Sequence, residues 1–480
     1  MHRASGGLNR QHASPVCRCL ALGLAASVCG CFSDTAPPAA QTTGDAAVSS
    51  QPTVTIVRGQ GSPISAFAFG QNYWDWVDWS NSGVTGLTGT ETLVTALQLN
   101  VIRAGGNNND TNSPSAFDTS QIDKFVAYCR TVGAEPILQV PLVADPDGGP
   151  ATAQNAADMV TYVNVTMGYD IKYWEVGNEP DLYPTNYDAG FAVQNAADYC
   201  TQFAAYVTAM RAANAAAPDG GVALQFLGPE LSYKYVAGDD WLTPFLDGCK
   251  DDVDIVTIHR YPFSGPETSV QGALTDVRSF QSTVSAVAAI VQGHARPGTP
   301  LGITEANISY DYALTSYTQS SLNAAPGTFY AALWTADVLG AALENNLWTL
   351  AFWNIGETSE TTSVLGFITS DQPVPAYYAQ WLVSSNFRGQ VLAPSGVPAG
   401  FSIYASYDTA VGSTSILVLN KTTAPSGLTL AVDTLPQQAL VFPALSLSVV
   451  QIPDSADGGT HILRYTADLA DAGTAPQMIQ

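Results

Sequence analysis

Positively charged residues are scarce in this sequence. Its 480 residues include 17 Lys and Arg against 41 Asp and Glu, which gives a formal net charge of -24. Proteins that bind nucleic acid concentrate positive charge to neutralise phosphates, so this balance argues against a nucleic-acid partner. Charged residues make up only 12% of the chain and hydrophobic residues 46%, a composition typical of a folded protein with a large core.

Several catalytic motifs are also missing. The chain has no Gly-Lys pair, hence no P-loop, and no G-x-S-x-G, H-E-x-x-H or G-x-G-x-x-G pattern. Only five His are present, and none has the spacing of a metal-ligand set. We therefore expect no metal and no cofactor, and chemistry other than that of nucleotide enzymes, metalloenzymes or serine hydrolases.

The N-terminal segment has the pattern of an export signal. Three Arg and no acidic residue precede a short apolar run at residues 19–28, which is too short to span a membrane. The run ends in Val28-Cys29-Gly30-Cys31, which resembles a degenerate bacterial lipobox. We predict a signal peptide over residues 1–31 and leave two alternatives open, a membrane tether through lipidated Cys31 or plain cleavage. Either places the protein outside the cell or at its surface.

Three Cys follow this segment: Cys129, Cys200 and Cys249. In an exported protein at most one pair of them can close. We favour Cys200 with Cys249, because the helices predicted to carry them should be neighbours. Three buried thiols are the alternative.

From residue 60 onward, strand-like and helix-like segments alternate. Helical periodicity is clearest after Asn195 and from Phe329 to Glu344. Strand-like apolar runs recur about every 40 residues, against about 31 in a minimal eightfold barrel. This alternation predicts an α/β fold, a (β/α)8 TIM barrel over residues 60–385. The eight runs begin near Ala66, Val101, Glu135, Ile171, Ala223, Ile255, Leu301 and Leu347.

The pattern changes outside that range. After Trp381, short strands separated by Gly, Pro, Ser and Thr predict an all-β sandwich over residues 386–453. Residues 53–57, Thr-Val-Thr-Ile-Val, are a candidate extra strand of it. We expect a flexible tether at residues 32–52 and a loose tail at 454–480. No linker separates the barrel from the sandwich, so we expect the two to form one folding unit. We also expect the protein to be a monomer.

The most informative stretch of the predicted barrel is residues 173–180, which read Tyr-Trp-Glu-Val-Gly-Asn-Glu-Pro. It begins as a strand with aromatic and β-branched residues, and Gly177 and Pro180 end it. Asn178 and Glu179 therefore lie at the carboxyl end of a strand. In TIM barrels, that end carries the catalytic residues.

Other polar residues should converge on the same mouth, because the carboxyl ends of parallel barrel strands meet at one face. Two carboxyl groups about 5–5.5 Å apart suit cleavage of a glycosidic bond, one attacking the anomeric carbon and the other protonating the leaving oxygen. An Arg stabilises the ionised member, Asn can bond a sugar hydroxyl, His and Tyr can orient the nucleophile, and Trp offers a flat face for a sugar ring. The candidates at the remaining strand ends are Arg103, His259, Tyr261, Glu305 and Trp353.

These motifs resemble those of the retaining glycoside hydrolases of clan A, over roughly residues 60–385. The resemblance lies in Asn178-Glu179-Pro180 on the fourth strand and Thr304-Glu305 on the seventh. Glu-Val-Gly-Asn-Glu-Pro-Asp and Arg-Ala-Gly-Gly-Asn are similar to families 79 and 44, and families 39 and 51 remain alternatives. The resemblance implies that Glu179 is the acid/base and Glu305 the nucleophile, with Arg103, Asn178, His259, Tyr261 and Trp353 around the substrate.

Three further residues have open roles. We predict that Glu175, four residues before Glu179, lines the barrel interior or pairs with Arg103. Among three Trp in residues 74–79, we favour Trp74 for stacking on sugar, with packing under the rim as the alternative. For Glu230, after Gly228-Pro229, we expect a loop contact, with sugar binding as the alternative.

Two functions fit these observations. The first is a retaining β-glycoside hydrolase that cleaves an extracellular polysaccharide or oligosaccharide by double displacement. The second is a non-catalytic, cell-surface carbohydrate-binding protein on a glycosidase scaffold. Degeneration would be expected to remove one of the two Glu, and both are present with Arg103 and His259, so we favour the enzyme.

Overall fold

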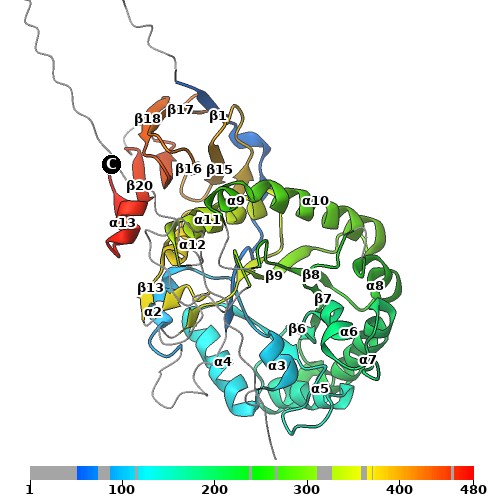
Figure 1. The fold of residues 1–480 in the computed structure, drawn as a ribbon. Helices are drawn as coiled ribbons and strands as arrows, with labels where there is room; N and C mark the ends of the chain where they lie inside the picture. Colours follow the sequence, from blue (N-terminus) through cyan, green and yellow to red (C-terminus); the bar gives the residue numbers. More distant parts are fainter. Residues whose placement is uncertain are drawn as a thin grey trace, which may run out of the picture. The chain divides into compact units, whose positions relative to one another are not determined.

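The computed structural model describes residues 51–73, 87–113, 117–236, 240–264, 269–310, 327–357, 365–369, 371–455 and 459–480. Its main feature is a closed barrel of eight parallel strands, ordered β10-β3-β4-β5-β6-β7-β8-β9 (Figure 1). The predicted TIM barrel is therefore confirmed. The strands are β3 (Phe69–Tyr73), β4 (Val101–Ala104), β5 (Glu135–Val140), β6 (Tyr173–Val176), β7 (Gln225–Leu231), β8 (Ile255–Arg260), β9 (Leu301–Ala306) and β10 (Leu350–Phe352).

The predicted runs match these strands with starts that differ by up to three residues. The run at Ile171 shows why. The Ile171 backbone N–H donates to the Asn164 side chain (2.8 Å), so strand pairing with β5 begins only at Tyr173. A side-chain partner of this kind competes with the ladder, and apolar pattern alone does not reveal it.

Helices surround the barrel (Figure 1). Both helices predicted from periodicity are present: α7 begins after the N-cap Asn195, and α11 runs from Phe329 to Glu344. The α-helices of the barrel are α2 (Glu91–Ala96), α3 (Asn107–Thr111), α4 (Thr119–Val132), α5 (Ala153–Val160), α6 (Tyr183–Asn186), α7 (Ala196–Asn214), α8 (Leu242–Cys249), α9 (Val270–Thr275), α10 (Val277–His294), α11 (Phe329–Glu344) and α12 (Pro375–Ser384). Shorter helical turns are η1 (Arg58–Gln60), η2 (Thr161–Thr166), η3 (Pro180–Leu182) and η4 (Pro218–Gly220).

Two further sheets make up the all-β region, and they enclose a second apolar core with Ile403, Ile416, Leu430 and Val450. One sheet has the order β1-β17-β18 and the other β2-β14-β15-β16-β19-β20-β21. Residues Thr53–Ile56 form β1 and pair with β17, so this segment is a strand of the region. The other strands are β2 (Ser62–Pro63), β14 (Gln390–Leu392), β15 (Phe401–Asp408), β16 (Ser413–Asn420), β17 (Ser426–Val432), β18 (Gln438–Phe442) and β19 (Ser446–Pro453), and a small third sheet contains β11 (Gly356–Glu357), β12 (Ile368–Thr369) and β13 (Gln372–Pro373).

The expectation of a loose tail at 454–480 was wrong. Residues His461–Thr466 form β20, which pairs with β19, and they are followed by α13 (Ala467–Asp471) and β21 (Gln477–Met478). Ile462 and Tyr465 are buried. Ile462 packs in the core of the all-β region and Tyr465 in the larger core with Phe329, so the two face opposite sides of β20 and the sequence shows no two-residue alternation.

Helix α11 joins barrel and all-β region, which explains why nearly all its residues are buried. On its side toward β15, Asp337 accepts a hydrogen bond from Tyr404 Oη (2.7 Å) and pairs with the Lys421 ammonium (2.7 Å). A Cβ at Gly340 would lie 2.3 Å from the Tyr404 ring, so the helix and strand approach closely there. Contacts this tight support the expectation of one folding unit.

Cys200 of α7 and Cys249 of α8 form a disulfide with their Cα atoms 5.7 Å apart, which confirms the favoured pairing. Cys129 is a buried free thiol. Among the described residues, no helix is both long and apolar enough to cross a membrane.

Candidate active site

The local backbone after β6 aims Glu179 at the barrel mouth. Gly177 has a φ of 73°, and a Cβ there would lie 2.6 Å from the Tyr183 hydroxyl, so only glycine fits. Glu179 itself has a φ of 49°, a left-handed conformation that is uncommon outside glycine and often marks a functional site. The Tyr183 hydroxyl accepts from the Asn178 N–H (3.0 Å) and donates to buried Asp110 (2.5 Å), which braces this turn.

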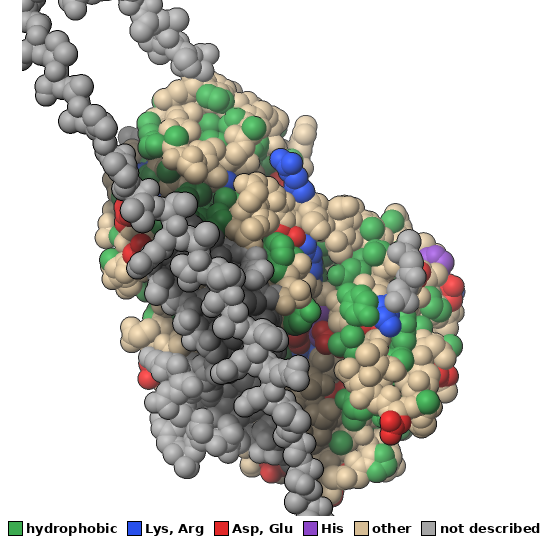
Figure 2. Space-filling model, in the orientation of Figure 1, with side chains coloured by type: hydrophobic (Ala, Val, Ile, Leu, Met, Phe, Trp, Pro, Cys, Tyr) green, Lys and Arg blue, Asp and Glu red, His purple; other side chains and the backbone are tan. Residues whose placement is uncertain are grey.

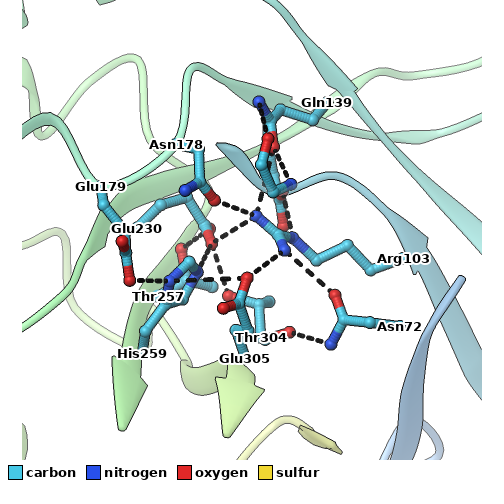
Figure 3. A network of polar contacts seen from close by, with 12 residues as sticks. Asn72, Arg103, Gln139, Asn178, Glu179, Glu230, Thr257, His259, Thr304 and Glu305 are labelled. Carbon is cyan, nitrogen blue, oxygen red and sulfur yellow. Dashed lines mark hydrogen bonds and ion pairs between the residues drawn. The ribbon is translucent and has the colours of Figure 1, made fainter. Parts of the chain in front are cut away.

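Arg103 lies at the centre of the site and is fully buried (Figure 3). Its Nε donates to Glu175 (2.6 Å), and one terminal nitrogen donates to Glu305 (3.0 Å). The guanidinium thus connects β4 with β6 and β9 and fixes the carboxylates relative to each other. It also donates to Asn72 (3.0 Å), Asn178 (3.0 Å) and Gln139 (3.3 Å).

The prediction that Glu175 pairs with Arg103 is confirmed. Both side chains are fully buried, and burial raises the pKa of Glu175 to about 8 even though Arg103 opposes this. Asn72 and Gln139 were missed from the sequence. Each lies one residue before the end of its strand, β3 or β5, as Arg103 does in β4, so a polar residue near the end of an apolar run was the available signal.

Glu305 accepts a hydrogen bond at each carboxylate oxygen. Tyr261 Oη donates to Oε1 (2.6 Å), and Arg103 donates to Oε2 (3.0 Å). These two donors hold the carboxylate in one orientation and stabilise negative charge on it.

Glu179 has a different environment. Its one described side-chain hydrogen bond joins Oε1 to His259 Nδ1 (3.0 Å), and the side chain stays 19% exposed at the mouth. Loss of water on burial raises the pKa of Glu179, and the Glu305 charge adds to this while His259 opposes it. One carboxylate oxygen of Glu179 and one of Glu305 lie within 4.8 Å of each other. The two groups are thus close together but differ in their surroundings.

His259 lies between carboxylates. Its Nδ1 contacts Glu179 (3.0 Å) and lies 3.9 Å from Glu305, and its Nε2 contacts Glu230 (2.8 Å). Burial alone would lower the pKa of His259, but the carboxylates of Glu305, Glu179 and Glu230 raise it to about 10. Glu179, His259 and Glu305 could together offer three ligand atoms to a metal ion, which would have to displace the proton on the imidazole.

Both expectations for Glu230, a loop contact or sugar binding, were wrong. Glu230 is fully buried inside β7 and accepts hydrogen bonds from Thr257, Thr304 and His259. A bulge causes this: Pro229 pairs with Thr257 and Leu231 with Ile258, so Glu230 is skipped. A proline inside a strand is a known signal for a bulge, and Pro229 was the available clue.

A pocket of about 620 Å³ opens above these residues. Figure 2 shows acidic side chains at the floor of a hollow on this face. Trp353 forms part of the wall and packs over Gly106, whose φ is 100° and whose Cβ would lie 2.7 Å from the indole. The described lining residues are Asn107, Asn108, Asn178, Glu179, Leu182, Ser232, Tyr233, Tyr261, Glu305, Tyr310 and Trp353.

Of the predicted site residues, Asn178, Glu179, Tyr261, Glu305 and Trp353 line the pocket. Arg103 and His259 lie beneath it, fully buried, and contact residues that line it: Arg103 contacts Glu305 and Asn178, and His259 contacts Glu179. Trp74 falls outside the described residues. Asp181, which sequence reasoning also missed, accepts from the backbone N–H groups of Ser232, Tyr233 and Lys234 and so fixes one rim of the pocket to the Glu179 turn.

Comparisons with known proteins find no matching family model and no matching curated protein. Solved structures do resemble this fold. A family 51 α-L-arabinofuranosidase, AbfB from Bifidobacterium longum, has a TM-score of 0.62 at 15% identity, over 84% of this chain and 100% of that one. A family 44 xyloglucanase from Paenibacillus polymyxa has a TM-score of 0.63 at 13% identity, over 84% and 100%. CelM2, a bifunctional glucanase-xylanase from a metagenome library, has a TM-score of 0.62 at 15% identity, over 84% and 99%. The predicted resemblance to clan A, and to family 44 within it, is confirmed at the level of the fold, and family 51, which was left open as an alternative, shares that fold.

Proposed function

We propose that the protein is a retaining β-glycoside hydrolase that cleaves an extracellular polysaccharide or oligosaccharide by double displacement. One observation carries the proposal: Glu179 and Glu305 face each other across a pocket with oxygens within 4.8 Å, in unlike surroundings. Retaining enzymes hold their two carboxyl groups about 5–5.5 Å apart, whereas inverting enzymes leave about 6.5–9.5 Å for a water. The spacing here suits direct attack by a carboxylate.

In the first step, a Glu305 oxygen forms a bond to the anomeric carbon while the bond to the leaving oxygen breaks. The leaving oxygen takes the electron pair of that bond and the proton of Glu179. Tyr261 and Arg103, which donate to Glu305, orient the attacking carboxylate. Glu179 suits the acid role because burial raises its pKa, so it keeps its proton to a higher pH than an ordinary Glu does.

In the second step, ionised Glu179 takes a proton from water, and the water oxygen attacks the anomeric carbon. The bond to Glu305 breaks and its electrons return to the carboxylate. Asn178, held by Arg103 (3.0 Å) at the pocket wall, is placed to bond a sugar hydroxyl, and Trp353 is placed to cover a ring face.

The alternative, a non-catalytic carbohydrate-binding protein, accounts less well for the buried ionic cluster. Buried ion pairs are a weak source of stability, so a site that only binds sugar gains little from them. Trp74 as a stacking residue and export by residues 1–31 remain part of the proposal, on the sequence observations alone. A lipid tether at Cys31 and plain cleavage both stay open.

A substrate screen tests the function. The protein without residues 1–31 is incubated with a panel of neutral and acidic polysaccharides and aryl β-glycosides, and products are sized. We expect hydrolysis of at least one substrate, and loss of that activity in Glu305→Gln. Glu135→Gln, an exposed carboxylate at the start of β5, is the matched control and should keep full activity. Binding without turnover by the unaltered protein would support the carbohydrate-binding alternative instead.

A further inference from the structure

A third buried carboxylate lies behind the two that face the pocket. Glu230 has no exposed surface, and its hydrogen-bond donors come from two strands, β8 and β9 (Figure 3). Thr257 donates to Oε1, while Thr304 (2.6 Å) and His259 Nε2 (2.8 Å) contact Oε2. Arg103 adds a charge at 3.7 Å. Burial alone would raise the pKa of Glu230, but the hydrogen bond from His259 and the charge of Arg103 lower it to about 2.

The backbone is distorted to achieve this placement. Glu230 has a φ of 57° and sits at the bulge of β7, and a second irregularity in the β8–β9 pairing precedes His259. Glu179, on the other side of His259, also has a left-handed backbone. Residues in such conformations persist only where surrounding structure holds them, and they concentrate at functional sites.

His259 faces a carboxylate at each ring nitrogen. A neutral imidazole carries only one N–H, so its other nitrogen would either present a lone pair to a carboxylate oxygen or accept the proton that Glu179 must keep for the leaving oxygen. Two N–H donors, and therefore a positive charge, satisfy both contacts. The charged groups that face the ring are Glu179 from the β6 turn, Glu230 from β7, Glu305 from β9 and Arg103 from β4.

We propose that Glu230 is a positioning residue that acts on the acid/base through His259, keeping the imidazole doubly protonated beside Glu179. This inference rests on the proposed function. When Glu179 gives its proton to the leaving oxygen, the new carboxylate lies 3.0 Å from a fixed positive charge. The positive charge stabilises that ion, and the buried Glu230 carboxylate stabilises the charge on His259 without itself touching the substrate.

The substitution Glu230→Gln tests this because it keeps the shape and removes the charge. His259 should then lose a proton, and Glu179 and Glu305 lose the nearby cation. Glu230 is the more distant group, so its own lost charge counts less. The acidic limb and the basic limb of the pH profile of kcat/KM should both move to higher pH by about 1 unit. A change of this size is the low end of the pKa shift that an adjacent charge produces. Thr257→Val removes a neutral donor to the same carboxylate and should leave both limbs in place.

A second measurement does not depend on activity. Nitrogen NMR of 15N-labelled imidazole, assigned with a His259→Gln variant, should show a doubly protonated His259 in the unaltered protein up to at least pH 8, and a neutral ring at that pH in Glu230→Gln. A neutral His259 in the unaltered protein would overturn the proposal, even if Glu230→Gln does not fold. Limbs that stay in place or move to lower pH would also overturn it. Failure of every substrate in the screen would instead count against the hydrolase function and leave the NMR result readable.

Discussion

The two ends of the barrel are formed by the same strands, but one end buries apolar side chains and the other buries charged ones. At the amino end, the rings of Phe67, Tyr173 and Trp348 pack together, with centroids 5.0–5.4 Å apart, over Val101 and Ile255 at the starts of their strands. At the carboxyl end, the barrel buries Arg103, His259 and three Glu in one network.

The difference separates stability from function. Apolar burial at the amino end stabilises the fold by about 25 cal/mol per Å². Burying charges removes them from water, which costs several kcal/mol for each ion and is offset only by pairing, so the carboxyl end adds little net stability. We infer that the amino end holds the barrel closed while the carboxyl end holds groups in protonation states they would not keep in water. The predictions below test that division.

The largest effect is expected at the acid/base. Glu179→Gln should lower kcat/KM, which reports the first step alone, by about 10²- to 10⁴-fold on a natural substrate, whose leaving oxygen needs a proton. The same substitution should lower kcat/KM far less on the corresponding glycosyl fluoride, because fluoride leaves without needing a proton. Steady-state rates on the two substrates measure the effect. An equal loss on both would remove Glu179 from the acid role.

Two tryptophans provide the next comparison. Trp348 at the amino end and Trp353 at the mouth are both buried, at 8% and 3% exposure. Each Trp→Ala change should destabilise the protein by about 3–5 kcal/mol, measured by chemical unfolding. Only Trp353→Ala should also raise KM for the folded enzyme, because only Trp353 lines the pocket. A KM change in Trp348→Ala would show that the two ends are not independent.

The smallest effect is a pH dependence of stability. Glu230 has a pKa of about 2 in the folded protein against 4.5 ordinarily, so its contribution is present above pH 4.5 and is lost as pH falls toward 2. His259 has a pKa of about 10 against 6.5, so its contribution is complete below pH 6.5 and is lost as pH rises toward 10. Burial raises the pKa of Glu175 to about 8, which adds to the loss above pH 4.5.

The melting temperature should therefore be highest at mildly acidic pH, near 4.5–6.5, and fall on both sides. Glu230→Gln should flatten the acidic side in a calorimetric titration. Trp348→Ala, at the apolar end, should lower the whole curve without changing its shape. A wild-type curve that rises steadily to pH 9 would contradict this assignment of charges.

The sequence correctly predicted those site residues whose position depends on a single strand and its end. Glu179 and Glu305 follow short apolar strands, so their place at the mouth comes from local pattern and barrel topology together. The Arg103–Glu175 pair was also within reach, because the two-residue period of a strand was extended from Glu179 back to Glu175, although β6 itself ends at Val176.

The features that the sequence did not predict depend on contacts with residues that are distant in the chain. The burial of Glu230 comes from a bulge against β8 and from donors on β8 and β9. Pro229 signals the bulge, but no local pattern identifies those donors. Strand β20 was missed for a similar reason, since its pairing with β19 and the burial of Tyr465 against Phe329 give it its place.

The central claim is that Glu305 attacks the sugar directly, with Glu179 as its acid. The most direct test is proton NMR of the reaction mixture with the best substrate from the screen, recorded from the first seconds, before mutarotation mixes the anomers. The two-carboxylate geometry predicts that the first-formed sugar has the same anomeric configuration as the bond that was cleaved. A first-formed product of inverted configuration would contradict it.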